Sequence, residues 1–190
     1  PWLEGLEPVE TFQHGAVQLA LFKKEPAVVT HDFTAGVLKA RVEKVAKGGR
    51  KVTRCKLDGK RFTCQPHGWN WVGPHMAEVG HQPYRCIFAH AVDGHTMRIT
   101  YPAVKLGRMV VGYTGIDDFE NRKRNDTPVT LRVQVGTHTV GETVHKNAWP
   151  WTRFTADTAR FEGQTHAVHF EIETPHAYAR TFCFAAEARK

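Results

Sequence analysis

Apolar and polar residues alternate with a period of two along most of the chain. In residues 129–135, 168–172 and 182–188, every second position is Val, Leu, Ile, Phe or Ala. This period is typical of a β-strand with one face in a core, because successive side chains of a strand point to opposite sides of the sheet. Shorter stretches of the same kind occur at 17–21, 38–42, 97–101 and 106–113.

Turn signals separate these stretches, with Gly-Gly, Asp-Gly and Asp-Thr-Pro at 48–49, 58–59, 93–94 and 126–128. Such residues favour the backbone conformations of tight turns. No long stretch follows the helical period, and we expect at most one short helical turn within 155–163. The pattern therefore predicts an all-β fold, a jelly-roll-like antiparallel β-sandwich of about ten strands.

The chain has 190 residues, of which 41% are hydrophobic. That length and composition suit one domain with a sizeable core, so we expect a single β-sandwich domain over residues 1–190. The longest stretch without a period is 65–83, where we expect a long loop. Apolar runs span only a few residues, so membrane insertion is not expected.

The charge is positive, with 26 Lys and Arg against 19 Asp and Glu, a formal net charge of +7. The basic residues are scattered, and the one basic cluster, at 122–124, has acidic neighbours. A general positive charge affects solubility and weak attraction to polyanions but confers no specificity. We therefore do not expect nucleic acid as a partner.

The four cysteines are Cys55, Cys64, Cys86 and Cys183. A turn centred on residues 59–60 would place Cys55 directly opposite Cys64, where a disulfide can form. Cys86 and Cys183 then remain as a long-range pair. An even count of paired cysteines suits an oxidising compartment. The alternative is four buried thiols in a cytosolic protein.

The second half of the chain carries a longer pattern. Its parts are Gly112-Tyr113-Thr114-Gly115-Ile116-Asp117-Asp118, Thr127 to Gly136, Trp151-Thr152-Arg153-Phe154 before Asp157-Thr158, Gly163, and the strand 167–172. Over residues 105–190 this resembles NPCBM-type carbohydrate-binding domains and the wider galactose-binding-like jelly rolls. The resemblance implies a jelly-roll fold and a carbohydrate partner.

Two tryptophan pairs are the candidate ligand-binding residues: Trp69-Asn70-Trp71 in the expected loop, and Trp149-Pro150-Trp151. An aromatic ring can pack on the apolar face of a pyranose while nearby polar groups hold its hydroxyls. The alternative is that one Trp of each pair closes the end of the sandwich.

The carboxylates of Asp117, Asp118 and Glu120 form the candidate metal site. Calcium takes six to eight oxygen ligands, and one acidic loop can supply part of that set. A structural calcium is therefore the one cofactor considered. The alternative is a solvated turn in which Asp117 caps a backbone amide.

The signs of catalysis are weak. The chain has no Ser, which excludes serine hydrolase mechanisms. Glu171 and Glu173 share a strand face at a spacing compatible with a glycosidase pair, but ordinary alternation with solvent explains them better. We therefore expect a noncatalytic carbohydrate-binding module of a secreted or cell-envelope protein, as part of a larger protein. The alternatives are a carbohydrate-active hydrolase and an adhesion domain that binds another protein.

Overall fold

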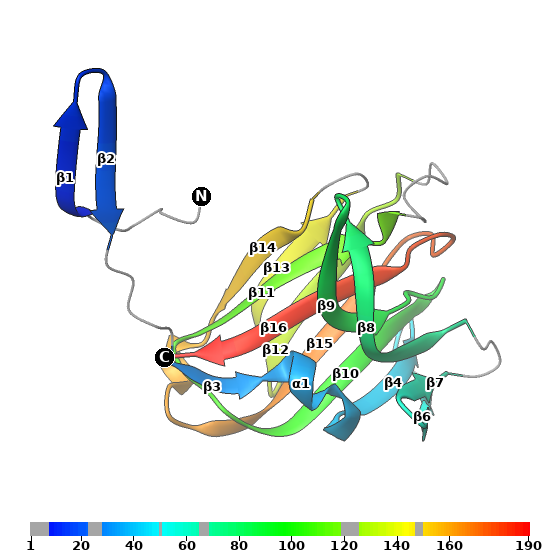
Figure 1. Ribbon diagram of the computed structural model, residues 1–190. Helices are drawn as coiled ribbons and strands as arrows, with labels where there is room; N and C mark the ends of the chain where they lie inside the picture. The colour runs from blue at the N-terminus through cyan, green and yellow to red at the C-terminus, as the bar shows by residue number, and fades with distance from the viewer. Residues whose placement is uncertain (1–7, 23–27, 50, 65–68, 119–125, 147–149) are drawn as a thin grey trace.

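Two antiparallel sheets pack face to face in the computed structural model (Figure 1). It describes residues 8–22, 28–49, 51–64, 69–118, 126–146 and 150–190. These residues form sixteen strands, one α-helical turn and two 3-10 turns. The expected all-β sandwich is confirmed. No helix in this part of the chain is long and apolar enough to cross a membrane.

The first sheet has six strands. In spatial order they are β13 (His138–His145), β12 (Val129–Val135), β15 (Thr165–Glu173), β10 (His95–Lys105), β4 (Arg41–Ala46) and β5 (Val52–Arg54). The period of two is clearest in β12, where every second residue from Val129 to Val135 is buried.

The second sheet has eight strands. Seven follow one another as β14 (Thr152–Asp157), β11 (Met109–Ile116), β16 (Phe182–Arg189), β9 (Gln82–Ala89), β8 (Trp71–Val79), β7 (Arg61–Thr63) and β6 (Lys56–Asp58). The eighth, β3 (Val29–Asp32), pairs with the end of β16. The helical turns are α1 (Phe33–Gly36), η1 (Val37–Lys39) and η2 (Ala159–Phe161), the last inside the expected segment 155–163.

The core lies between the two sheets and is centred on aromatic rings. The ring of Phe33 lies 4.9 Å from those of Tyr101 and Phe170, and Phe170 lies 5.0 Å from Phe184. The Tyr101 hydroxyl donates a 2.7 Å hydrogen bond to the carbonyl of Phe33, so its polar end is satisfied inside the core. This cluster joins α1 to both sheets.

A separate two-stranded hairpin precedes the sandwich. It consists of β1 (Pro8–His14) and β2 (Val17–Phe22), which pair only with each other among the described residues. The expected apolar face of 17–21 is present, but Val17, Leu19 and Leu21 are 56–64% exposed. The reason is that no other element covers this hairpin in the described chain (Figure 1).

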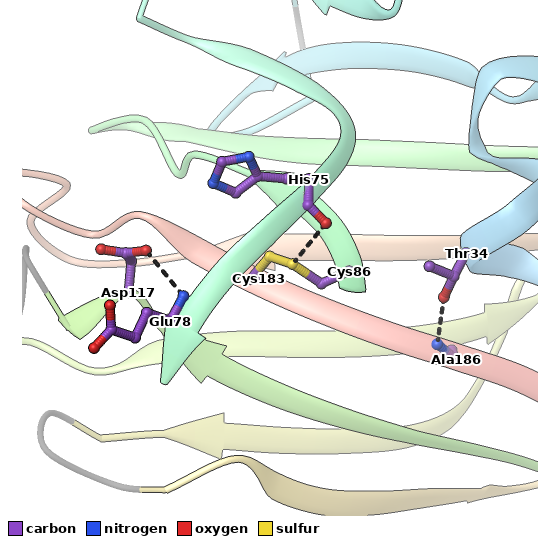
Figure 2. The surroundings of a disulfide bond; sticks show 7 residues. All are labelled: Thr34, His75, Glu78, Cys86, Asp117, Cys183 and Ala186. Carbon is purple, nitrogen blue, oxygen red and sulfur yellow. Dashed lines mark hydrogen bonds between the residues drawn. A yellow bond between two sulfur atoms is a disulfide. The ribbon is translucent and has the colours of Figure 1, made fainter. Parts of the chain in front are cut away.

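Both expected disulfides are present. Residues 56–58 pair with 61–63 in the register that places Cys55 opposite Cys64. Cys86 on β9 and Cys183 on β16 join neighbouring strands across 97 residues of sequence (Figure 2). The alternative of four free thiols is thereby excluded for this fold.

The expected loop over 65–83 is wrong. Within it, Trp71 to Val79 form strand β8, which pairs with β9 from Val72 to Val79. Gly73 and Pro74 break the alternation of apolar residues and hid this strand in the sequence. Pro74 is tolerated because β7 pairs only with the start of β8, so that edge needs no donor there.

The two disulfides are expected to stabilise the fold unequally. In the chain-entropy view a cross-link gains with the length of the loop it closes. Replacing Cys86 and Cys183 with Ala should lower the free energy of unfolding by about 4–5 kcal/mol, and the same change at Cys55 and Cys64 by about 2–3 kcal/mol. Urea unfolding of the two double variants, with mass spectrometry of nonreduced digests, measures this. Equal losses, or alkylatable thiols in the oxidised protein, would contradict it.

Candidate functional site

A hollow of about 370 Å³ lies at one end of the sandwich, where three connections meet. Residue 69 comes just before β8, residues 90–93 connect β9 to β10, and residues 177–179 connect β15 to β16. The last two connections cross from one sheet to the other. The lining residues are Trp69, His90, Val92, Asp93, Ala177, Tyr178 and Ala179.

Two aromatic side chains stand exposed at this hollow. Trp69 is 51% and Tyr178 60% exposed, although both lie beside a well-packed core. The Trp69 ring lies 4.8 Å from the His90 ring in an edge-on arrangement, which leaves an indole face uncovered by this contact. Tyr178 lies beside the His176 ring at 6.4 Å. Each exposed ring therefore has an imidazole as its neighbour.

Asp93 joins two of the connections. One carboxylate oxygen accepts a 2.5 Å hydrogen bond from the amide of Ala177, and the other lies 3.7 Å from Nδ1 of His176. The Asp93 carboxylate therefore fixes the loop that carries Tyr178. The same carboxylate borders the hollow, where it can accept further hydrogen bonds.

The loop before β16 is anchored by the side chain of Arg180, which is fully buried. Its guanidinium donates to the carbonyls of Ala179 at 2.8 Å and Thr127 at 3.3 Å. Ala179 has a φ of +53°, a left-handed conformation that is costly for a residue with a Cβ atom. The surrounding contacts hold this backbone in place, and with it the neighbouring Tyr178.

This arrangement suits a small polar ligand with an apolar face. The lining is largely apolar, and the exposed rings offer stacking surfaces. His90 brings an imidazole to the hollow and Asp93 an acceptor, while His176 lies beside Asp93. A ring that bears hydroxyl groups on its edge and C–H groups on its face matches these features.

The first tryptophan pair divides between two roles. Trp69 lies in the hollow, whereas Trp71 stacks on Phe88 at 4.0 Å and has the Arg61 guanidinium 4.3 Å above its ring. Both faces of Trp71 are thus covered, so it packs and does not offer a stacking surface. Asn70 is 1% exposed, which removes its side chain from the surface. Of these three candidates only Trp69 is exposed at the hollow.

Of the second pair, only Trp151 is placed by the structure. Trp149 is outside the described residues. Trp151 stacks on Tyr84 at 4.7 Å and packs on the same cluster as Trp71, and it is not among the residues that line the hollow. Its indole covers Gly115, where a Cβ atom would come within 2.8 Å of it. Trp151 therefore packs against the sheet and does not line the hollow that holds Trp69.

The acidic segment holds the tip of the β8–β9 hairpin. Asp117 accepts from the amide of Glu78, as Figure 2 shows, and Asp118 accepts from the amides of Gly80 and His81 at 3.0 and 2.8 Å. These contacts match the capped-turn alternative. Ligand atoms of Glu78, His81 and Asp118 also lie within 4.8 Å of one another, a grouping that could hold a metal ion. Glu120 lies outside the described residues.

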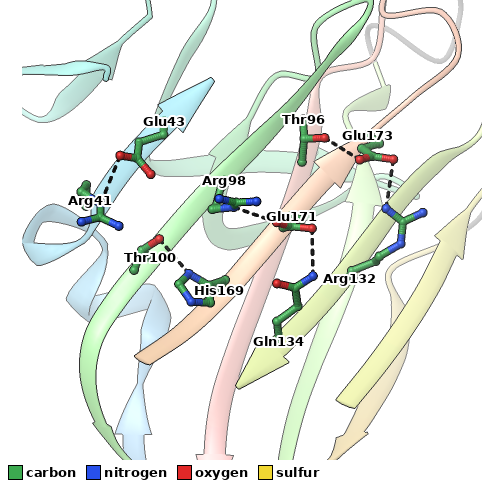
Figure 3. Close-up of polar contacts among 10 residues, drawn as sticks. All are labelled: Arg41, Glu43, Thr96, Arg98, Thr100, Arg132, Gln134, His169, Glu171 and Glu173. Carbon is green, nitrogen blue, oxygen red and sulfur yellow. Dashed lines mark hydrogen bonds and ion pairs between the residues drawn. The ribbon is translucent and has the colours of Figure 1, made fainter. Parts of the chain in front are cut away.

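The carboxylates on the outer face of the six-stranded sheet are bound to their neighbours (Figure 3). Glu171 accepts from Arg98 at 2.7 Å and from Gln134 at 3.1 Å. Glu173 accepts from Thr96 at 2.5 Å and from Arg132 at 3.0 Å. A pair engaged in this way lacks the free acid that glycoside hydrolysis requires.

The pKa of Glu173 reflects these contacts. Burial opposes its ionisation, but the hydrogen bonds from Thr96 and Arg132 hold the pKa below its usual value. A general acid needs a raised pKa, so this carboxyl is unsuited to that role. The lowered pKa of Glu173 instead indicates a structural ion pair with Arg132.

Sequence reasoning missed most of the hollow. Tyr178 and Asp93 were not singled out, because each lies in a connection with no motif of its own. Asp93 belongs to an Asp-Gly turn, which signals only a turn. Trp69 is the one residue of the hollow that the sequence suggested as a ligand contact. The other lining residues come close to it only because the connections between the two sheets end side by side.

The Asp118 carboxylate is expected to stabilise the hairpin tip. Asp118→Ala removes the acceptor of two backbone amides and should lower the free energy of unfolding by about 1–2 kcal/mol. Glu78→Ala, which removes no amide acceptor, should cost less than about 0.5 kcal/mol. Chemical denaturation compares the two, and equal losses would contradict the capping role.

Calcium binding at Asp117 and Asp118 stays a prediction, tested by the melting temperature in EDTA and in added calcium.

The stability should fall in acid in two stages. Burial lowers the pKa of His31, His75 and His169 below the usual 6.5. The unfolded chain then binds protons that the folded chain does not, so stability is lost as the pH falls below about 6.5. Glu173, with its lowered pKa, adds a second loss below about pH 4.5.

Calorimetry between pH 8 and pH 3 measures this dependence. His169→Gln should reduce the fall in melting temperature between pH 7 and pH 5, and Glu173→Gln the fall below pH 4.5. A melting temperature that stays constant from pH 7.5 to pH 5 would show that the histidines titrate normally in the fold.

No protein-family model and no curated protein sequence matches the chain. Similar solved structures include the CBM51-2 and INT domains of Clostridium perfringens ZmpB in complex with GlcNAc, at 13% identity and a TM-score of 0.43. Another is the CBM51 domain of Clostridium perfringens GH95 in complex with methyl-galactose, at 8% identity and a TM-score of 0.43. A third holds the M60 catalytic domain of ZmpB with both its CBM51 domains, at 13% identity and a TM-score of 0.48.

These matches cover 88%, 99% and 90% of this chain. The chain spans 97% of the GH95 domain but only 28% and 20% of the two ZmpB chains. At such identities and TM-scores the likeness shows neither family membership nor a ligand.

Proposed function

We propose that this chain is a noncatalytic carbohydrate-binding module whose sugar occupies the hollow between Trp69 and Tyr178. The observation that carries the proposal is the exposure of two aromatic rings at one hollow that also holds a carboxylate. Exposed apolar surface gathered in a hollow and bordered by polar groups is typical of a ligand-binding groove. A pyranose ring would cover one of them with its apolar face.

The polar groups of the hollow support the same ligand. Asp93 can accept hydrogen bonds from sugar hydroxyls, and the imidazole of His90 lines the same hollow. Sugars present several hydroxyls in fixed directions, which a few convergent polar groups recognise well. The loop that carries Tyr178 is fixed before the ligand arrives, which favours binding.

Binding without catalysis fits the carboxylates that the structure describes. Glu171 and Glu173 are engaged by arginines, and the chain contains no Ser. Asp93 already holds a backbone amide. This favours the binding module over a hydrolase.

We place the module outside the cell or in the periplasm or cell envelope, as one part of a larger protein. Two disulfides support an oxidising compartment, because thiols are kept reduced in the cytosol. Modules of this kind gain their use by holding an attached domain near a polysaccharide, which raises its effective concentration there.

A protein-binding role is the second candidate, and the β1–β2 hairpin favours it. Phe12, Leu19 and Leu21 lie on one face of this hairpin and are 52–64% exposed. A two-stranded hairpin is only marginally stable alone, so a covering partner would stabilise it. This role concerns a different surface and can coexist with sugar binding.

Removing either ring should weaken sugar binding with little effect on stability. Trp69→Ala and Tyr178→Ala should each weaken binding about tenfold, because stacking and burial together are worth about 1.4 kcal/mol or more. Because both rings are exposed, each change should alter the free energy of unfolding by less than about 1 kcal/mol. A glycan array identifies the ligand, and titration calorimetry measures the variants.

Phe12→Ala is the matched control, because it removes an exposed aromatic ring from the separate hairpin. It should leave the affinity for sugar unchanged. Absence of any glycan ligand, or equal affinity in the two hollow variants and the wild type, would overturn the proposal. Trp71→Ala should behave oppositely, with a clear loss of stability from its contact with Phe88.

A further inference from the structure

The charge of the hollow between Trp69 and Tyr178 has one sign. Among the described residues that line it, Asp93 is the one with a formal charge when histidine is neutral, and neither Lys nor Arg borders it. The chain as a whole carries a formal net charge of +7. The hollow is therefore a local negative site on a positive protein, and general charge attraction would not draw a cation to it.

The Asp93 carboxylate keeps its charge available to a ligand. Its side chain is 61% exposed, and its ion-pair partner in the described chain is the imidazole of His176, 3.7 Å away. That imidazole is a cation only when it is protonated, so it does not compensate the carboxylate permanently. The amide of Ala177 occupies one acceptor position. An ionised carboxylate has about four such positions, so further donors can bind.

The His90 ring adds an acceptor. Its Nδ1 lies 2.7 Å from the carbonyl oxygen of Ala91. A carbonyl oxygen only accepts hydrogen bonds, so Nδ1 carries the proton and Nε2 of the neutral ring is an acceptor. The ring that lines the hollow therefore has the same polarity as the carboxylate.

The two exposed rings share this polarity. Trp69 is 51% and Tyr178 60% exposed. The face of an aromatic ring carries partial negative charge and attracts a cation that lies within about 6 Å of its centre, most strongly at tryptophan. A carboxylate, an imidazole acceptor and two ring faces thus line one hollow. Together they match a ligand group that is positive and rich in donors.

From this shared polarity we infer that the hollow takes an amino sugar whose nitrogen is protonated, such as a glucosamine unit without an N-acetyl group. The inference rests on the proposed function, because the sugar ring occupies the same hollow. The ammonium group donates to the Asp93 carboxylate, and the C–H groups beside the charged nitrogen contact an aromatic ring. An N-acetyl group would remove the charge and bring a carbonyl acceptor toward groups that themselves accept.

The test uses two oligosaccharides that differ only at nitrogen. The whole chain is titrated with the tetrasaccharide of β-1,4-linked glucosamine and with its fully N-acetylated counterpart, at about pH 6.5, below the usual pKa of an amino group. We expect the amino form to bind at least fivefold more tightly than the N-acetylated form. Trp69→Ala and Tyr178→Ala should each weaken its binding at least fivefold.

Asp93→Asn separates the charge from the anchoring of the loop. The asparagine retains a side-chain oxygen that can accept from the Ala177 amide, but it carries no charge. This variant should weaken binding of the amino form at least fivefold more than binding of the N-acetylated form. The melting temperature, measured alongside, should change little because the loop keeps its hydrogen bond.

Asp58→Asn is the matched control. Asp58 also precedes a glycine in a turn and is exposed, but it lies on β6 and does not line the hollow. The change removes the same charge from the protein and should alter the affinity for the amino form less than twofold. An effect as large as that of Asp93→Asn would show that net charge alone governs binding and would overturn the inference.

Two further outcomes would overturn the inference and leave the proposed function standing. One is that the N-acetylated form binds as tightly as the amino form or more tightly, while Trp69→Ala and Tyr178→Ala still weaken it. The other is that Asp93→Asn weakens both forms equally, which would reduce the carboxylate to an anchor of the loop. If neither tetrasaccharide binds at millimolar concentration, the inference fails, and the glycan array decides the proposed function by itself.

Discussion

The pairing of β16 within the eight-stranded sheet is the constraint on which the rest of the structure depends. This strand pairs with β11 along all eight of its residues, with β9 at its start and with β3 at its end. Phe182 and Phe184 point into the core, and Cys183 on the other face is bonded to Cys86. Both faces of the strand are thus engaged, and the hollow of the candidate site lies just before this strand begins.

The parts of the fold that the sequence predicted are those governed by local rules. Apolar and polar residues alternate over 129–135 because one face of this strand packs in the core, so the period of two follows directly from the fold. The Cys55–Cys64 bond followed from the register of one short hairpin. The strand β8 escaped detection because it carries Gly73-Pro74 and because aromatic packing on its outer face removes the contrast between its two sides.

The candidate site could be predicted only through Trp69. The other residues that line the hollow lie in the connections between the two sheets. Residue spacing in a sequence does not show which of these connections end side by side. Asn70 illustrates the opposite error, since a polar residue beside tryptophans suggested a ligand contact, but the fold buries its side chain. The sequence showed that aromatic and polar residues occur together at 69–71, but only the fold shows which of their side chains are exposed.

The left-handed backbone at Ala179 has a consequence for how substitutions would act. Asp93 accepts from the Ala177 amide and Arg180 donates to the Ala179 carbonyl, so the backbone is held on both sides of Tyr178. A glycine at position 179 would relieve the unfavourable φ and yet enlarge the set of conformations open to the unfolded chain. Alanine at position 179 therefore has an unfavourable φ in the folded state, but it loses less conformational entropy on folding than glycine would.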